Sequence, residues 1–371
     1  MFETFWANNE FSLKDNCFSK NAKQVALGIS MSNECIFSEL GIKGDPWLLS
    51  DLDFYSKYCK LYNDKAEKIV GKRLLNETYI NNSDLNFPST KGIADIFEGK
   101  YKISGGSSWL HSDIETPSEL SNMLDRADKR IENLREFYLP QNWYSEKKRI
   151  YEKYGKTPEI FRGIRGPVTL AMSIYGVENL IYLINEDPAL AKRFSNSITN
   201  ALLAAGELMD TEAGYTKNNA PHGFGFSDDN CCMLNAEMYE FFAYPILKAV
   251  FERYSPNKND RRHQHSDSAM GHLLPILGKL DLTSVNFGPT VMFTEIRKYL
   301  PNACIRGCIA PFTFMRNETD NLIAQVKRDC EAEKNSGRRG LCLTTAGSIN
   351  DGSLLTSLKT IIESVIEYGT Y

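Results

Sequence analysis

The chain has 371 residues and a formal net charge of −4, with 42% hydrophobic and 24% charged residues. This composition is typical of a soluble protein with a large core, and the lack of a basic stripe argues against nucleic acid as the main partner. No apolar run is long enough to span a bilayer, and Met1 to Asn8 lack the basic and apolar regions of a signal peptide, so we expect a cytoplasmic location without membrane contact.

The first 157 residues contain one clearly marked helix. Thr116 to Glu119 form a capping box with proline at the first helical position, and an apolar stripe follows at helical spacing up to Leu134. The segment from Gly105 to His111, before this helix, is expected to be a loop. If it covers a site, Trp109 and His111 bind substrate; an ordinary surface turn with a packed tryptophan is the alternative.

From about residue 158 onward, short apolar strands alternate with helices. Asp187 and Pro188 mark a helix start, and Gly214 marks its end. Strands are expected over 160–164, 223–227, 263–267, 284–287, 304–308 and 341–345, and helices over 188–213, 235–253 and 354–368. Six strand–helix units in a row imply parallel strands joined by right-handed crossovers.

The predicted fold is α/β, a TIM (β/α)8 barrel with an N-terminal helical elaboration. A closed barrel needs eight strands, so two would lie in residues 1–157. We therefore expect one domain over 1–371, in which 1–157 supply the elaboration and the first units and 158–371 supply the remaining six. An open doubly wound sheet competes with this architecture, but no G-x-G-x-x-G follows an early strand.

His263, His265 and Asp267 form the most informative pattern, at the end of an expected strand. Positions two apart on a strand point to one face, so these three side chains project together. Two imidazoles and a carboxylate suit a divalent metal, a proton relay or an anionic substrate. Histidines that only cap loops or form hydrogen bonds are the plainer alternative.

Other polar residues stand at the ends of neighbouring strands. Asp228 and Asp229 are adjacent, so one is expected to face the barrel interior, where it could orient a substrate, while the other caps the next helix. Arg306 shares a face with Cys308 if that strand is regular. Arg165 and Arg306 could each clamp a carboxylate or phosphate, or pair with a neighbouring acid.

Several of these strand ends resemble the uroporphyrinogen decarboxylase superfamily. The segment from Gly163 to Ala171 resembles its G-x-x-G-P-x-T-L motif, and His265 to Asp267 fall where it has H-x-C-G or H-x-D-G. Further similar segments, in the same order, are Ser227–Asp229, Glu237–Pro245, Arg306–Pro311, Thr345–Ile349 and Tyr368–Tyr371. The resemblance covers about residues 158–371.

The resemblance separates two branches of this superfamily. The decarboxylases carry an R-Q-A-G-R segment that is absent here, a tyrosine replaced by Ser173, although Tyr175 is close, and a last-strand histidine replaced near Ala346. The methyltransferases move methyl groups between a corrinoid-carrying protein and a thiol or a methylated donor, often with zinc held by H-x-C and a later cysteine. Here Asp267 takes the place of the first cysteine, and the later one falls near Gly347 or Ser348.

The resemblance therefore implies a methyltransferase-like enzyme that moves a methyl group between a small methylated substrate and a corrinoid protein or thiol. A decarboxylase or lyase acting on a small carboxylate and a non-catalytic cofactor-binding barrel are the alternatives. We expect a homodimer and zinc or another divalent metal. The expected catalytic residues are His265, Asp267, Asp228, Asp229 and Tyr175, with substrate-binding Arg165, Arg306, Trp109 and His111, and metal ligands His263, His265, Asp267 and Cys308.

Overall fold

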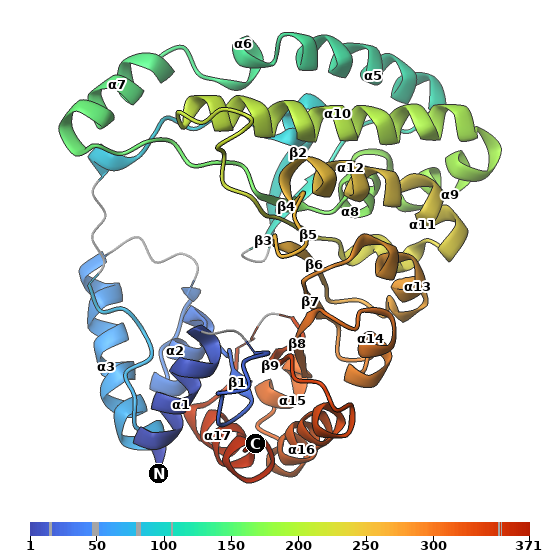
Figure 1. The fold of residues 1–371 in the computed structure, drawn as a ribbon. Helices are drawn as coiled ribbons and strands as arrows, with labels where there is room; N and C mark the ends of the chain where they lie inside the picture. Colours follow the sequence, from blue (N-terminus) through green and yellow to red (C-terminus); the bar gives the residue numbers. More distant parts are fainter. Residues whose placement is uncertain (15–16, 47–51, 79–82, 105–106, 348, 350) are drawn as a thin grey trace. The chain divides into compact units, whose positions relative to one another are not determined.

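The computed structural model describes residues 1–14, 17–46, 52–78, 83–104, 107–347, 349 and 351–371 (Figure 1). These residues group into two compact units. The first unit comprises Met1–Asn81, Gln264–Leu274 and Asp281–Tyr371, and the second comprises Asn82–His263 and Pro275–Leu280. The chain passes from the second unit to the first within strand β6 (Arg262–Ser266).

The first unit is built on parallel strands covered by helices. Its strand order is β1-β9-β8-β7, and Leu27 pairs with Leu343, Arg306 with Cys342 and Asn286 with Arg306. Helices α16 and α17 pack side by side, and α17 also packs on α3 (Figure 1). The strands are β1 (Ala26–Leu27), β7 (Ser284–Phe287), β8 (Cys304–Ile309) and β9 (Leu341–Thr345); the helices are α1 (Phe2–Lys14), α2 (Asn33–Leu40), α3 (Leu52–Val70), η4 (Gly271–Leu273), α14 (Phe293–Tyr299), α15 (Pro311–Met315), α16 (Thr319–Asn335) and α17 (Leu355–Tyr368).

The second unit is mostly helical and surrounds the parallel pair β4 (Gly163–Arg165) and β5 (Phe224–Ser227). The long helix α10 (Pro188–Glu212) packs on α5, α9 and α12. The remaining elements are η2 (Ser83–Leu85), α4 (Ile93–Ile96), β2 (Lys100–Ser104), β3 (Ser107–His111), α5 (Pro117–Glu132), α6 (Leu134–Tyr138), α7 (Trp143–Tyr154), α8 (Pro167–Tyr175), α9 (Val177–Glu186), η3 (Asp229–Met233), α11 (Ala236–Phe242), α12 (Tyr244–Tyr254) and η5 (Gly278–Leu280); α13 (Leu274–Leu277) runs across the division between the units.

Local sequence signals explain where several helices begin. The Thr116 hydroxyl accepts the backbone N–H of Glu119 at 3.3 Å, and the Glu119 carboxylate accepts the N–H of Thr116 at 2.9 Å, which is the expected capping box of α5. The Asp187 carboxylate accepts the N–H of Leu190 at 3.0 Å and caps α10. The helix expected over 235–253 is instead two helices, α11 and α12, which are divided at Ala243; Pro245 lies in the first turn of α12 and lacks the backbone N–H that would continue the hydrogen bonds of α11.

The α/β class and the TIM-barrel type predicted from the sequence are confirmed. Six strands fall within residues 158–371 as expected, and β7 and β9 have the predicted ends. In the described part of residues 1–157 only β1 joins this series of strands, which makes seven rather than eight. The pair β2 and β3 forms a separate antiparallel hairpin, because Lys100 pairs with His111 and Lys102 with Trp109.

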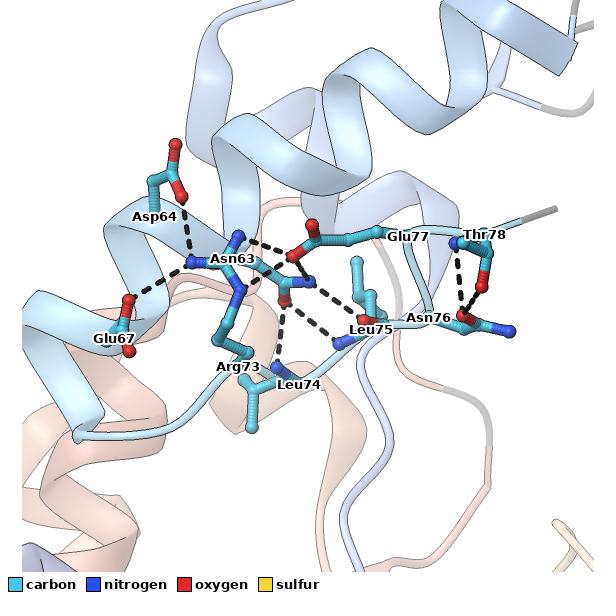
Figure 2. Close-up of polar contacts among 9 residues, drawn as sticks. All are labelled: Asn63, Asp64, Glu67, Arg73, Leu74, Leu75, Asn76, Glu77 and Thr78. Carbon is cyan, nitrogen blue, oxygen red and sulfur yellow. Dashed lines mark hydrogen bonds and ion pairs between the residues drawn. The ribbon is translucent and has the colours of Figure 1, made fainter.

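A buried asparagine ties an irregular segment of the first unit to α3 (Figure 2). The Asn63 side chain is fully buried; it accepts the N–H groups of Leu74 and Leu75 at 2.8 and 2.9 Å and donates to the Leu75 carbonyl and the Glu77 carboxylate, both at 2.8 Å. The Arg73 guanidinium pairs with carboxylates that include Glu77. The Asn63 side chain thus supplies the hydrogen-bond partners that the backbone groups of Leu74 and Leu75 would otherwise find within a regular helix or strand.

No single helix among the described residues is long and apolar enough to cross a bilayer. Helices α8 and α9 meet the length and composition only as a pair, which is bent by 101°.

Candidate functional site

His265 and Asp267 meet at the end of β6, within the first unit. The Nε2 atom of His265 lies 3.1 Å from Oδ1 of Asp267, and the two side chains are 24% and 44% exposed. The other ring nitrogen, Nδ1, lies 2.7 Å from Oδ1 of Asn286 on β7. The imidazole is therefore held from both sides, by a carboxylate near solvent and by an amide from the next strand along the chain.

The Asn286 amide is fixed by the strands beyond it. Its Nδ2 atom donates to the carbonyl of Arg306 at 2.6 Å and to the carbonyl of Thr345 at 3.2 Å. The hydroxyl of Thr344 lies 3.4 Å from the same nitrogen. Side chain and backbone from β7, β8 and β9 thus converge behind His265.

Gly347, after β9, lies against Asp267. A Cβ at Gly347 would stand 2.9 Å from Oδ1 of Asp267, and the φ of +113° is one that L side chains rarely adopt. Glycine is therefore needed for this close approach. The later metal-binding cysteine of the methyltransferases is expected at Gly347, which supplies no thiolate, or at Ser348, which lies outside the described residues.

The structure places Cys308 against α16. Its thiol is buried and its N–H lies 3.4 Å from the Asp329 carboxylate; burial, then the nearby Asp329 charge, raise the pKa of the thiol. Gly307, with φ of +147°, interrupts the regular alternation that would put Cys308 on the face of Arg306. Among the described residues, neither Cys308 nor His263 belongs to a group of three side chains close enough to share a metal ion.

The prediction that His263 and His265 share one face of their strand agrees with the burial pattern. Gln264 and Ser266 of β6 are buried, whereas His263 and His265 between them are partly exposed. The two histidines belong to different units, so β6 contributes His265 together with Asp267 to the first unit.

Asp228 and Asp229 lie in the second unit, and Asp228 is fully buried. Its carboxylate accepts the N–H of Thr169 at 2.7 Å, the hydroxyl of Thr169 at 2.8 Å and the N–H of Val168 at 3.3 Å. These groups belong to the first turn of α8, so Asp228 caps that helix from the end of β5. Burial raises the pKa of Asp228 to about 6, although these hydrogen bonds oppose the change.

Asp229 follows as the first residue of η3 and is partly exposed. The aspartate expected to cap the next helix does not do so: Asp228 makes no side-chain cap on η3 and instead caps α8, which precedes it in the chain, because the end of β5 lies against the first turn of α8. Asp229 is the more accessible carboxylate.

The remaining predicted residues lie on α8, β3, β4 and β8. Tyr175 is buried at the end of α8, and burial, with the charge of Glu119, raises its pKa. Trp109 and His111 lie on a strand rather than in a loop, and Trp109 is 61% exposed, so the packed tryptophan of the alternative interpretation is wrong.

Arg165 and Arg306 lie on β4 and β8 of different units and are both exposed. The hydrogen bond with Cys17 and, to a lesser extent, the charge of Arg306 lower the pKa of Cys304, whereas burial raises the pKa of Cys342 and the charge of Arg306 only partly opposes this. These two arginines retain the accessibility that binding an anionic group requires.

Sequence reasoning did not single out Asn286. The only sequence feature that could have indicated Asn286 is its position as a polar residue near the end of the predicted strand 284–287, two residues before Gly288. Its contacts with His265, Arg306 and Thr345 span between 20 and 59 residues of sequence, so they emerge only when the strands are in register.

Comparison with known proteins places these features in a family. Residues 144–368, well over half of the chain, match the family "Uroporphyrinogen decarboxylase (URO-D)". A solved structure described as "methyltransferase from Methanosarcina mazei" has a similar fold, with a TM-score of 0.51, 13% sequence identity and coverage of 93% of this chain and 94% of that chain. No curated protein sequence matches significantly. The chain belongs to the uroporphyrinogen decarboxylase family.

Proposed function

We propose that this protein is an enzyme of the methyltransferase type, with His265 and Asp267 at its reactive centre. The observation that carries the proposal is the contact of 3.1 Å between the imidazole and the carboxylate at a strand end, with the imidazole anchored by Asn286. TIM-barrel enzymes place reactive groups at the carboxyl ends of their strands. The family match and the fold shared with a methyltransferase support the choice of reaction class.

The proposed substrate is a small compound with a methyl group on oxygen, sulfur or nitrogen. Transfer breaks the bond between the methyl carbon and this heteroatom, which then needs a proton. An imidazolium at His265, stabilised by Asp267, supplies that proton, and the neutral imidazole takes one up again before the next turnover. A corrinoid, when carried to the site by a partner protein, would supply the nucleophile that accepts the methyl group; a thiol is the alternative acceptor.

His265 and Asp267 could also act together by binding a divalent metal ion. The imidazole nitrogen and the carboxylate are suitable donors for zinc or another divalent metal, whereas the thiolate set of the zinc-dependent branch is not provided by Gly347 or Cys308. We therefore propose that any metal here is held by nitrogen and oxygen donors. Such an ion would supply Lewis-acid activation of the substrate heteroatom.

Metal analysis and activity assays test these proposals together. Protein purified without added metal is analysed for zinc, manganese and iron, and is then incubated with cobalamin or a thiol and a panel of methoxylated, methylthio and methylamino compounds. His265→Ala and Asp267→Asn should each abolish demethylation. His222→Ala is the matched control, because His222 also contacts an aspartate, Asp260, at 3.0 Å, but in the second unit.

The outcomes separate the alternatives. Stoichiometric metal that disappears in His265→Ala supports the metal-bound form, and a metal-free active enzyme supports the acid–base form. Methyl transfer is refuted if no compound of the panel is demethylated; release of CO2 from a small carboxylate would instead favour a decarboxylase. Asp229, Tyr175, Arg165 and Arg306 are proposed to contribute to catalysis or substrate binding, with alanine variants of each as the test.

A further inference from the structure

We infer that Asn286 is a positioning residue, which holds His265 in the tautomer that carries its proton on Nδ1. The inference concerns the reactive centre of the proposed function, but it is argued from hydrogen-bond geometry and does not depend on the reaction class. All of the atoms involved belong to the first unit.

The hydrogen-bond partners of the Asn286 amide fix its orientation. An amide has a donating NH2 group at one end and an accepting oxygen at the other. One end of Asn286 lies 2.6 Å from the carbonyl of Arg306 and 3.2 Å from the carbonyl of Thr345. Carbonyl oxygens can only accept, so the NH2 group must face them, and the amide oxygen must face His265.

The orientation of this amide in turn fixes the position of the imidazole proton. The Oδ1 atom of Asn286 lies 2.7 Å from Nδ1 of His265 and can only accept, so Nδ1 must carry the hydrogen. With the hydrogen on Nδ1 fixed in this way, Nε2 bonds to the Asp267 carboxylate only when it also carries a proton, that is, in the imidazolium; in the neutral histidine Nε2 presents its lone pair. This is the nitrogen that lies beside the Asp267 carboxylate.

The two ring nitrogens of His265 therefore have different roles. Nδ1 donates a hydrogen bond to the Asn286 amide on β7, and Nε2 is the atom that gains or loses a proton or binds a metal ion. In metal sites and catalytic triads this anchoring is usually provided by a carboxylate or a backbone carbonyl. Here an asparagine provides the anchor, because its NH2 group is held by hydrogen bonds to the carbonyls of Arg306 on β8 and Thr345 on β9.

Nitrogen NMR of the histidine rings tests the inference directly. The chain has five histidines, so protein labelled with 15N-histidine gives few ring signals, and His265→Gln identifies those of His265. At a pH where His265 is neutral, its Nδ1 should resonate as a protonated nitrogen and its Nε2 as an unprotonated one. Asn286→Ala removes the acceptor and should shift the ring toward the Nε2–H tautomer, with Asp267 as the new acceptor.

Two further variants distinguish positioning from a general structural effect. Asn286→Asp retains an acceptor toward Nδ1, and its second oxygen can face the carbonyls of Arg306 and Thr345 only when it is protonated; in that protonated form it should retain the Nδ1–H tautomer. Thr344→Val removes only the longest contact of the amide, at 3.4 Å, and should leave the tautomer unchanged. If a metal is bound, Asn286→Ala should also weaken its binding about 10- to 100-fold, as the loss of such an anchor typically does.

The inference is overturned if wild-type His265 is the Nε2–H tautomer, or if folded Asn286→Ala retains the wild-type nitrogen shifts. Should Asn286→Ala not fold, the wild-type spectrum still decides the question. Its failure is distinguishable from failure of the proposed function: an Nδ1–H tautomer in a protein that demethylates nothing would refute methyl transfer and leave the role of Asn286 intact.

Discussion

Asp228 makes the stability of the protein depend on pH in a direction opposite to that of most carboxylates. Burial raises its pKa from 3.8 to about 6 in the folded chain. At about 1.4 kcal/mol for each pH unit, the difference corresponds to about 3 kcal/mol. Because the folded pKa lies above the unfolded one, Asp228 stabilises the fold fully below about pH 3.8, and this contribution is lost as the pH rises through about 6.

The variant Asp228→Asn isolates this contribution, since it keeps the side-chain shape and removes the titrating group. Urea unfolding of both proteins, followed by tryptophan fluorescence from about pH 4 to about pH 8, gives the free energy of unfolding at each pH. The wild-type value minus that of Asp228→Asn should fall by about 2–3 kcal/mol over this range. Subtraction of the two curves removes the contribution of all other ionisable groups.

Thr169→Val provides the opposing variant. The hydroxyl of Thr169 donates to Asp228 at 2.8 Å and lowers its pKa, so its removal should move the transition to higher pH and enlarge the fall. Parallel curves for the wild type and Asp228→Asn would refute the argument, because they would mean that folding does not change the affinity of Asp228 for its proton.

Three further predictions concern stability. Asn63→Ala should lower the free energy of unfolding by about 1–3 kcal/mol in urea titrations, because two backbone N–H groups lose their acceptor; the exposed Asn76 of Figure 2, changed to alanine, should cost less than about 0.5 kcal/mol. Glu212→Ala should destabilise by about 1–3 kcal/mol, since the buried indole N–H of Trp143 donates to it at 2.8 Å; Glu212→Gln, which keeps an acceptor, should cost less. Gly166→Ala should yield little folded protein in circular dichroism, because its Cβ would stand 2.2 Å from that of Asp228; a wild-type melting curve would contradict this reasoning.

The sequence by itself determined the elements whose signals are local. The ends of β7 and β9 and the capping box of α5 follow from residues within a few positions of one another, and the structure confirms them. The order of strand and helix then implied parallel strands and the barrel type. His263 and His265 share a face because a strand alternates with a period of two.

Only the tertiary structure decided which side chains meet. Cys308 lies against α16 because Gly307 breaks the alternation that a regular strand would have, and Asp228 caps a helix 59 residues earlier in the chain. The anchoring of His265 by Asn286 depends on the register of β7, β8 and β9. Such contacts join residues that are distant in sequence, and their geometry is fixed by the packing of whole strands and helices rather than by any pattern within one segment.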